Sequence, residues 1–377
     1  MKIPHGSAAA AIFTIILVSI GCNPLNVDRE TIAVAAVSHS VSEPSLNTTP
    51  IPRGNRLLGI ETTTVPPGLT YEDNMVKAQS MNAQATCMSI QWNQIEPKPK
   101  EYADPDFGLS IANLYYPTKN MKLSLIIRSI DTVVTPVPSD LKNTRFDDPK
   151  MITRFQAMLD WVFDKIPKLE LSSLQIGNEI DLNVISTPSF WSQYATFVKE
   201  VVSHVHMTRP GTLVGFTVTH RTAGSNLEAN ILAAAKTADV IGITYYPLNE
   251  DFTVKPSSVV AGDFARIVQA FGTKTIHIAE IGLPTGKANQ SSETLQSQFL
   301  ESVFLAWDIH VDKIPYVSID RLVDYNHSEA KSMAAEYGIR NNVAFTSFIE
   351  TLGLQSFAGV DKSAVATLRR LTQERSW

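Results

Sequence analysis

Eight short apolar segments alternate with longer amphipathic segments between Leu57 and Leu352. The apolar segments have the length of buried strands, and the amphipathic ones place apolar residues at helical spacing. Strands that alternate with helices pair in parallel through right-handed crossovers. The predicted strands are Leu57–Ile60, Ala85–Gln91, Lys122–Arg128, Ser172–Ile180, Thr212–Val218, Asp239–Tyr246, Thr273–Glu280 and Ile314–Ile319.

One amphipathic helix follows each predicted strand, and the last of them closes the pattern. These helices are Tyr71–Met81, Asp106–Tyr115, Pro149–Ile166, Ser189–Val205, Leu227–Thr237, Ser257–Phe271, Ser292–Ile309 and Asn342–Leu352. Eight such units in roughly 300 residues are typical of a (β/α)₈ TIM barrel of the α/β class. A doubly wound open sheet is the alternative, but it usually carries a glycine-rich phosphate turn after an early strand, and no such turn occurs in the sequence.

Composition excludes some classes of partner. The chain has 377 residues, is 44% hydrophobic and carries a formal net charge of -5. It has no basic stripe or charge block, so nucleic acid is not an expected partner. We expect a monomer. The histidines show no metal-binding pattern, and we expect neither a metal nor a cofactor.

The N-terminus reads as an export signal over residues 1–22. Its apolar run, Ala8–Ile20, is too short for a comfortable membrane span. The run ends in Ser19-Ile-Gly-Cys22, which resembles a lipoprotein signal with Cys22 as the lipidated residue. An ordinary secretory signal is the alternative. Either reading predicts an exported protein, at the cell surface, in the periplasm or secreted, with membrane contact only through a lipid at Cys22. Residues 23–52, rich in Ser, Thr and Pro, predict a disordered tether.

Two of the predicted strands end in a glutamate. Glu179 closes Leu-Gln-Ile-Gly-Asn-Glu, and Glu280 closes Thr-Ile-His-Ile-Ala-Glu. Active sites of (β/α)₈ barrels lie at the carboxyl ends of the strands. Strands four and seven lie on roughly opposite sides of a barrel of eight, so the two carboxylates can converge over its mouth. We therefore interpret Glu179 and Glu280 as a working pair.

A pair of carboxyl groups, one protonated and one ionised, is what a retaining glycosidase requires. Taken singly, either glutamate could equally serve in a salt bridge or as a helix cap. Both follow apolar strands, where an unpaired charge is costly. The pair therefore favours catalysis over a structural role.

The two motifs resemble those of the clan A glycoside hydrolases, which are (β/α)₈ retaining enzymes. Leu174–Glu179 is similar to the strand-four motif, and Ile278–Thr285 resembles the strand-seven motif, with Leu283 in place of the usual aromatic residue. Tyr-Tyr-Pro247 at the end of strand six is similar to the endo-β-1,4-galactanases, and other features are cellulase-like. The resemblance implies that residues 53–377 form one catalytic domain.

By this resemblance Glu179 is the acid/base and Glu280 the nucleophile. Asn178 is expected to bind the sugar 2-hydroxyl, although an ordinary turn residue is the alternative. The implied reaction is hydrolysis of O-glycosidic bonds, of β configuration, in a carbohydrate substrate by double displacement. A transglycosidase with the same site and a non-catalytic carbohydrate-binding lipoprotein are the alternatives.

Four further residues are predicted to bind substrate. Period-two alternation directs Tyr246 inward beside the nucleophile and Tyr245 outward. Arg128 ends strand three and is expected to pair with the nucleophile, with an exposed loop arginine as the alternative. His220 follows strand five. Trp92 suits a sugar-stacking platform.

Strand eight departs from the family pattern. Clan members commonly place a tryptophan there under the sugar, and Tyr316–Tyr325 contains none. Asp320, Asp324 or Tyr325 is expected to take its place. Glu96, in the segment after strand two, is expected to be structural.

Overall fold

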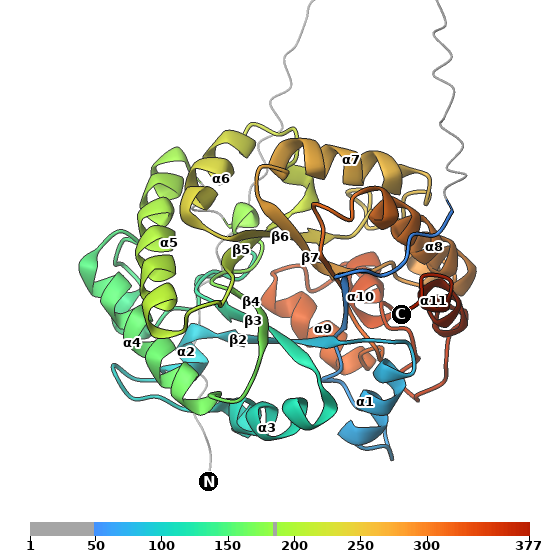
Figure 1. Ribbon diagram of the computed structural model, residues 1–377, viewed down its shortest axis with the longest axis horizontal. Coiled ribbons are helices and arrows are strands. Elements are labelled where there is room, and N and C mark those ends of the chain that lie inside the picture. Colours follow the sequence, from blue (N-terminus) through green and yellow to red (C-terminus); the bar gives the residue numbers. More distant parts are fainter. Residues whose placement is uncertain (1–48, 184–186) are drawn as a thin grey trace, which may run out of the picture. The chain divides into compact units, whose positions relative to one another are not determined.

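The computed structural model describes residues 49–183 and 187–377. Eight parallel strands close into a barrel in sequence order, β1 to β8 (Figure 1). The strands are β1 Leu57–Ile60, β2 Ala85–Gln91, β3 Lys122–Arg128, β4 Leu171–Gln175, β5 Val214–Thr219, β6 Val240–Tyr245, β7 Thr275–Ile281 and β8 Tyr316–Ile319. The predicted TIM barrel is therefore confirmed. The proposed signal, Cys22 and most of the tether lie outside the described residues.

A ring of helices surrounds the barrel (Figure 1). These helices are α1 Tyr71–Gln79, α3 Gly108–Tyr115, α4 Pro149–Lys165, α5 Pro188–Thr208, α6 Glu228–Ala234, α7 Val259–Phe271, α8 Glu293–Ile309 and α11 Ser363–Gln373. Local sequence sets several of their starts. Asp148 caps α4 by accepting a hydrogen bond from the Lys150 amide, and Pro149 stands at the first helical position.

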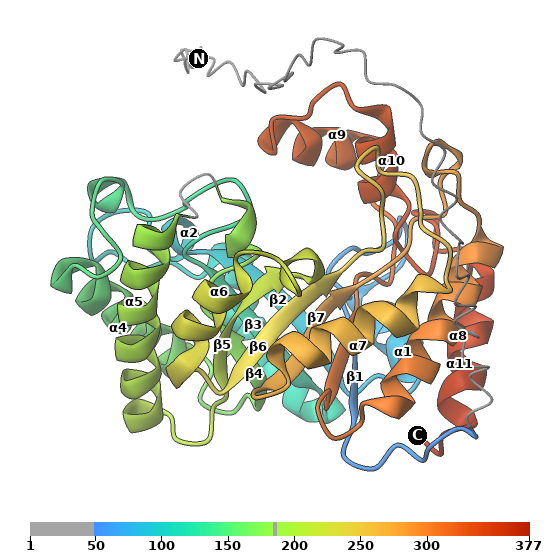
Figure 2. The ribbon, with the colours of Figure 1, turned by 90° about the horizontal axis from the view of Figure 1, so that it is seen from above.

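The last predicted helix forms, but it does not close the outer ring as predicted. The predicted segment at Asn342–Leu352 does form a helix, α10 Val343–Glu350, but this helix belongs to an insertion together with α9 His327–Glu336. Figure 2 places both above the carboxyl ends of the strands. The outer ring is closed by α11 instead, which the sequence reading did not identify. A one-turn helix, α2 Trp92–Ile95, was missed as well.

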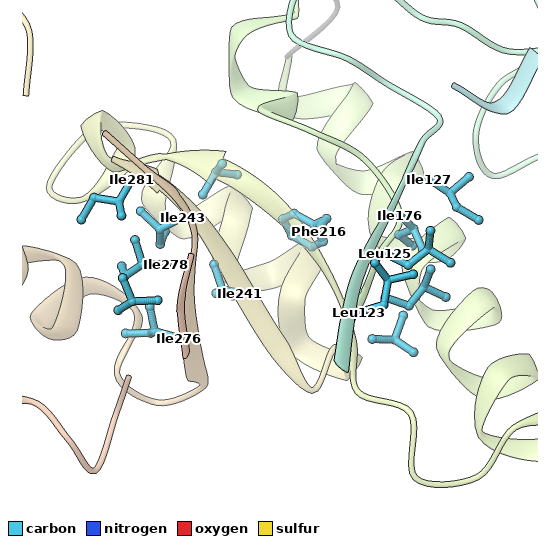
Figure 3. Close-up of a cluster of buried hydrophobic side chains, with 14 of the residues drawn as sticks. Leu123, Leu125, Ile127, Ile176, Phe216, Ile241, Ile243, Ile276, Ile278 and Ile281 are labelled. Atoms are coloured by element: carbon cyan, nitrogen blue, oxygen red, sulfur yellow. The ribbon is translucent and has the colours of Figure 1, made fainter. Parts of the chain in front are cut away.

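The largest hydrophobic core lies between the strands and the helix ring. Figure 3 shows its strand side, formed by outward-facing residues of β3, β5, β6 and β7 and by the residue directly after β4: Leu123, Leu125, Ile127, Ile176, Phe216, Ile241, Ile243, Ile276, Ile278 and Ile281. Several of the alternate, inward positions are small or polar, such as Ser124, Ser173 and Thr217. Gly242 is one of them, and a Cβ there would lie 2.6 Å from the Thr217 methyl carbon. The barrel interior is thus packed shut below the mouth.

No helix within 49–183 and 187–377 is both long and apolar enough to cross a membrane.

Candidate active site

A cavity of about 740 Å³ opens at the carboxyl ends of the barrel strands. Every strand, or the residues directly after it, contributes to its wall. The predicted residues that line it are Asn178, Glu179, Glu280, Tyr246, Arg128 and His220. The fold therefore gathers into one cavity residues that lie far apart in the sequence.

Glu179 occupies the turn after β4 in a left-handed backbone conformation, with φ 44° and ψ 47°. A residue other than glycine adopts this conformation at a cost, and such residues cluster at functional sites. The Thr217 hydroxyl accepts the Glu179 amide hydrogen at 2.9 Å. The two carboxylate oxygens accept from Thr244 at 2.6 Å and from Thr132 at 3.2 Å. Burial raises the pKa of Glu179 to about 7, against the hydrogen bond from Thr244.

Gly177 and Asn178 explain why the chain can make this turn. A Cβ on Gly177 would lie 2.6 Å from the Tyr194 hydroxyl, which donates to the Ile176 carbonyl. Glycine is therefore required for the close approach of α5. Asn178 accepts from the Thr217 hydroxyl at 2.7 Å, which fixes the amide at the cavity wall.

Glu280 reaches the cavity through an irregularity in β7. The pairing of β6 with β7 shifts between Ile243 and Thr244, so that Thr244 pairs with Glu280 and Tyr245 with Ile281. A bulge of this kind turns a side chain to the other face of a strand. Burial, with the charges of Asp320 and Glu179, raises the pKa of Glu280 well above its ordinary value.

Tyr246 contacts two carboxylates. Its hydroxyl lies 3.0 Å from a Glu280 oxygen and 2.6 Å from an Asp320 oxygen. A phenol has one proton to donate, so the two carboxylates compete for it. Tyr245 points outward and donates to Asp263 of α7 at 2.7 Å. The alternation predicted for this pair of tyrosines is confirmed.

The end of β6 therefore links the two glutamates. Thr244 holds Glu179, and Tyr246, two residues further on and on the same inward side, holds Glu280. Alternate residues of a strand lie roughly 7 Å apart. Two partly buried carboxyl groups thus face the same cavity, one from the turn after β4 and one from β7.

Arg128 lies in the cavity wall but pairs with Asp131 at 2.6 Å. The prediction that it pairs with Glu280 was wrong, because Asp131 follows β3 closely enough to take the guanidinium first. Asp131 also lies 3.5 Å from the Asn178 amide nitrogen. Arg128 therefore belongs to the group that holds the β4 turn.

His220 follows β5 and packs edge-on against Tyr245, with ring centroids 4.9 Å apart. Burial lowers its pKa to about 4. The imidazole is therefore neutral at physiological pH, and it can offer a hydrogen bond to a neutral ligand.

The prediction that Trp92 is a sugar platform was wrong. Its side chain is fully buried, donates to Glu96 at 3.0 Å and packs edge-on against Phe155 of α4. The single turn of α2 directs Trp92 behind the barrel wall instead of into the mouth. Glu96 is structural, as predicted, because it is buried and pairs with Arg154.

The segment after β8 contributes residues that the sequence reading left open. Asp320 and Arg321 both line the cavity, whereas Asp324 is paired with Lys362 at 2.8 Å. Tyr325 also lines the cavity, and the Arg321 guanidinium lies 3.5 Å from its ring centroid. An acid, an arginine and a tyrosine thus stand where clan A enzymes place a tryptophan.

The α9–α10 insertion adds an apolar wall that was missed. Tyr337, Phe345 and Phe348 line the cavity and pack with Phe252 from the loop after β6. At the end of α9, Glu336 accepts a hydrogen bond from Gln91 of β2 at 3.2 Å. The insertion therefore extends from the β8 side of the mouth to β2. The only signal of this wall in the sequence is the presence of aromatic residues in the insertion.

Among the described residues, no group of three or more His, Cys, Asp or Glu side chains is arranged to hold a metal ion. The chemistry available at the mouth is that of carboxyl groups, three tyrosines, three arginines and the His220 imidazole. One carboxyl group can donate a proton, and another can attack or stabilise a cation.

No protein-family model matches the chain, and no curated protein does. Solved structures do resemble it. The exo-β-1,4-mannosidase Op5Man5 from Opitutaceae bacterium strain TAV5 matches with a TM-score of 0.64 at 15% identity, over 87% of this chain and 61% of that one. The GH5_18 from Bifidobacterium longum subsp. infantis matches with a TM-score of 0.64 at 11% identity, over 85% and 79% of the two chains.

A family 39 glycoside hydrolase from Bacteroides cellulosilyticus WH2 matches with a TM-score of 0.58 at 13% identity, over 85% of this chain and 64% of that one. These neighbours give no support to the finer resemblance to galactanases. They confirm the predicted likeness to clan A glycoside hydrolases at the level of the fold: the chain has the (β/α)₈ barrel that these glycosidases share.

Proposed function

We propose that the protein is a retaining glycoside hydrolase that cleaves β-linked sugars by double displacement. The observation that carries the proposal is the pair of partly buried carboxyl groups, Glu179 and Glu280, held over one cavity by Thr244 and Tyr246 at the end of β6. The resemblance of both sequence motifs to clan A supports the same assignment. A carboxyl pair across a sugar-sized cavity is the minimum that this reaction needs.

Glu179 is the acid/base in this proposal. With a pKa of about 7, it holds its proton at mildly acidic pH, yet it loses that proton readily enough to act later as a base. The proton goes first to the glycosidic oxygen of the leaving group. Glu179 then takes a proton from the water that releases the sugar from the enzyme.

Glu280 is the nucleophile. In the proposed active form the coupled pair carries a single proton on Glu179, and Glu280 attacks the anomeric carbon as the carboxylate, although burial and the charges of Asp320 and Glu179 raise its pKa. Tyr246 donates to the carboxylate and keeps it oriented. Asn178 is placed to bind the hydroxyl next to the anomeric carbon, where a hydrogen bond strengthens in the transition state.

The names of the structural neighbours support a β-glycoside substrate. They include an exo-β-1,4-mannosidase and a β-glycosidase, and one GH5_18 was solved with Manβ1-4GlcNAc. Export to the cell surface, through the signal and Cys22, is part of the proposal and would bring the enzyme to extracellular glycans.

The test is hydrolysis of a panel of aryl β-glycosides by the purified protein, with the anomer of the first product followed by ¹H NMR. We expect the β anomer to appear first and then to mutarotate. Glu179→Gln and Glu280→Ala should each abolish hydrolysis. Near-normal turnover in either variant, or an α product, would sink the assignment. Product analysis at high sugar concentration distinguishes hydrolysis from transglycosylation.

A further inference from the structure

Three charged side chains line one side of the cavity next to the proposed nucleophile. Glu61 directly follows β1, and Asp320 and Arg321 directly follow β8. The two strands pair in register, with Ile60 opposite Ile319, so these residues emerge side by side. The proposed mechanism uses none of the three.

Glu61 presents an unused acceptor. One carboxylate oxygen, Oε1, accepts from the Thr63 amide at 2.6 Å and from the Thr63 hydroxyl. The other oxygen, Oε2, is buried and has no hydrogen-bond partner among the described residues. A buried carboxylate oxygen without a partner is costly, so the chain maintains this arrangement against its own stability.

Arg321 presents unused donors beside it. The side chain is only 5% exposed, yet Nε and Nη1 find no hydrogen-bond partner within the described part of the chain. Its guanidinium stacks 3.5 Å from the Tyr325 ring centroid, and Nη2 lies 3.6 Å from Asp320. The ring and the acid hold the guanidinium in place and leave the Nε and Nη1 donors without a partner in the described part of the chain.

Contacts of Asp320 and the shared cavity lining place Glu61 and Arg321 near the proposed nucleophile, Glu280. Asp320 and Glu280 share the Tyr246 hydroxyl. Glu61, Asp320 and Glu280 line the same cavity as Cys87, and burial together with their charges raises the pKa of the Cys87 thiol. The sugar attacked by Glu280 therefore lies within reach of Glu61 and Arg321.

We propose that Glu61 and Arg321 bind neighbouring hydroxyl groups of an uncharged sugar beside Glu280, and so make the enzyme selective for neutral glycones. This inference rests on the proposed function. A sugar diol suits the pair, because a carboxylate oxygen accepts from one hydroxyl and a guanidinium donates to the next. A uronic acid does not suit it, because its carboxylate would join those of Glu61, Asp320 and Glu280 in a buried site.

The experiment compares the wild type, Glu61→Gln and Arg321→Met on an aryl β-hexoside, its 6-carboxylate and its monodeoxy analogues. Glu200→Gln, a change on α5 at a half-exposed residue that does not line the cavity, is the matched control. We expect each pocket variant to lower kcat/KM on the neutral hexoside by about 10- to 100-fold, the range for a lost charged hydrogen bond, mainly by raising KM. The wild type should prefer the hexoside to the 6-carboxylate.

The deoxy analogues give the sharper result. The analogue that lacks the hydroxyl bound by Glu61 should be a poor substrate for the wild type and no poorer for Glu61→Gln. Equal losses on every analogue, or a wild-type preference for the 6-carboxylate, would overturn the inference while leaving the proposed function intact. If no aryl glycoside is hydrolysed, the proposed function fails. In that case, calorimetry measures the affinities for the methyl β-hexoside and its 6-carboxylate. Tighter binding of the neutral hexoside supports the inference, and tighter binding of the 6-carboxylate overturns it.

Discussion

The two ends of the barrel differ in how fully their charged side chains are paired. At the amino end, Asp308 of α8 pairs with Arg56 and with Arg375, both at 2.7 Å, and the three side chains satisfy one another. At the carboxyl end, acids outnumber their partners, and Glu61 and Arg321 keep unpaired polar atoms. The first arrangement holds the segment before β1 and the segment after α11 against α8. The second leaves polar groups to be completed by a ligand, which is how a stable fold accommodates a costly site.

The largest expected effect on activity is that of Glu280→Ala at the carboxyl end of the barrel. We expect kcat/KM to fall by about 10⁴-fold or more, because the attacking group is removed. The free energy of unfolding should not fall, because the change removes a partly buried carboxyl group repelled by Asp320 and Glu179. Chemical denaturation beside the kinetic assay checks both. A marked loss of stability would mean that Glu280 is a structural residue.

Asp308→Ala should show the reverse pattern. It leaves Arg56 and Arg375 buried without their partner, a change that costs about 3–5 kcal/mol. Activity per folded molecule should stay at the wild-type level below the melting temperature. Urea denaturation and active-site titration measure the two quantities. An unchanged midpoint would contradict the structural role given to this end of the barrel.

The pH dependence of kcat/KM tests whether Glu179 is the acid. Glu179 must be protonated to act, so kcat/KM should decline as pH rises through about 7. The Thr244 hydroxyl donates to the ionised carboxylate and holds this pKa down. Thr244→Val should therefore move the alkaline limb to higher pH. A limb that stays in place, or moves down, would speak against Glu179 as the acid.

The smallest effect on activity is expected from a change at Trp92, which lies in the core and not in the cavity. Trp92→Phe removes a buried hydrogen bond to the Glu96 carboxylate and should cost about 2 kcal/mol of stability. It should leave KM unchanged, because the ring lies behind the barrel wall. A higher KM would restore the sugar-platform reading.

Sequence reasoning was most successful where local pattern decides structure. The alternation of strands and helices predicted the barrel, and β1, β2 and β3 have the predicted limits. It was least successful after β8, where α9, α10 and α11 follow one another without a strand to mark which helix closes the ring. Trp92 failed for a related reason, since a single helical turn after β2 reverses the face on which a side chain emerges.

The sequence by itself determined that eight strands alternate with helices and that two of these strands lead to Glu179 and Glu280. Only the tertiary structure decided where those carboxyl groups point. Alternation from Ile276 and Ile278 would send Glu280 outward, toward the helices, and the bulge in β7 turns it into the cavity. The left-handed turn at Glu179 depends likewise on contacts from β5 and β6. A local pattern sets the period of a strand, but the pairing of neighbouring strands sets where that period is broken.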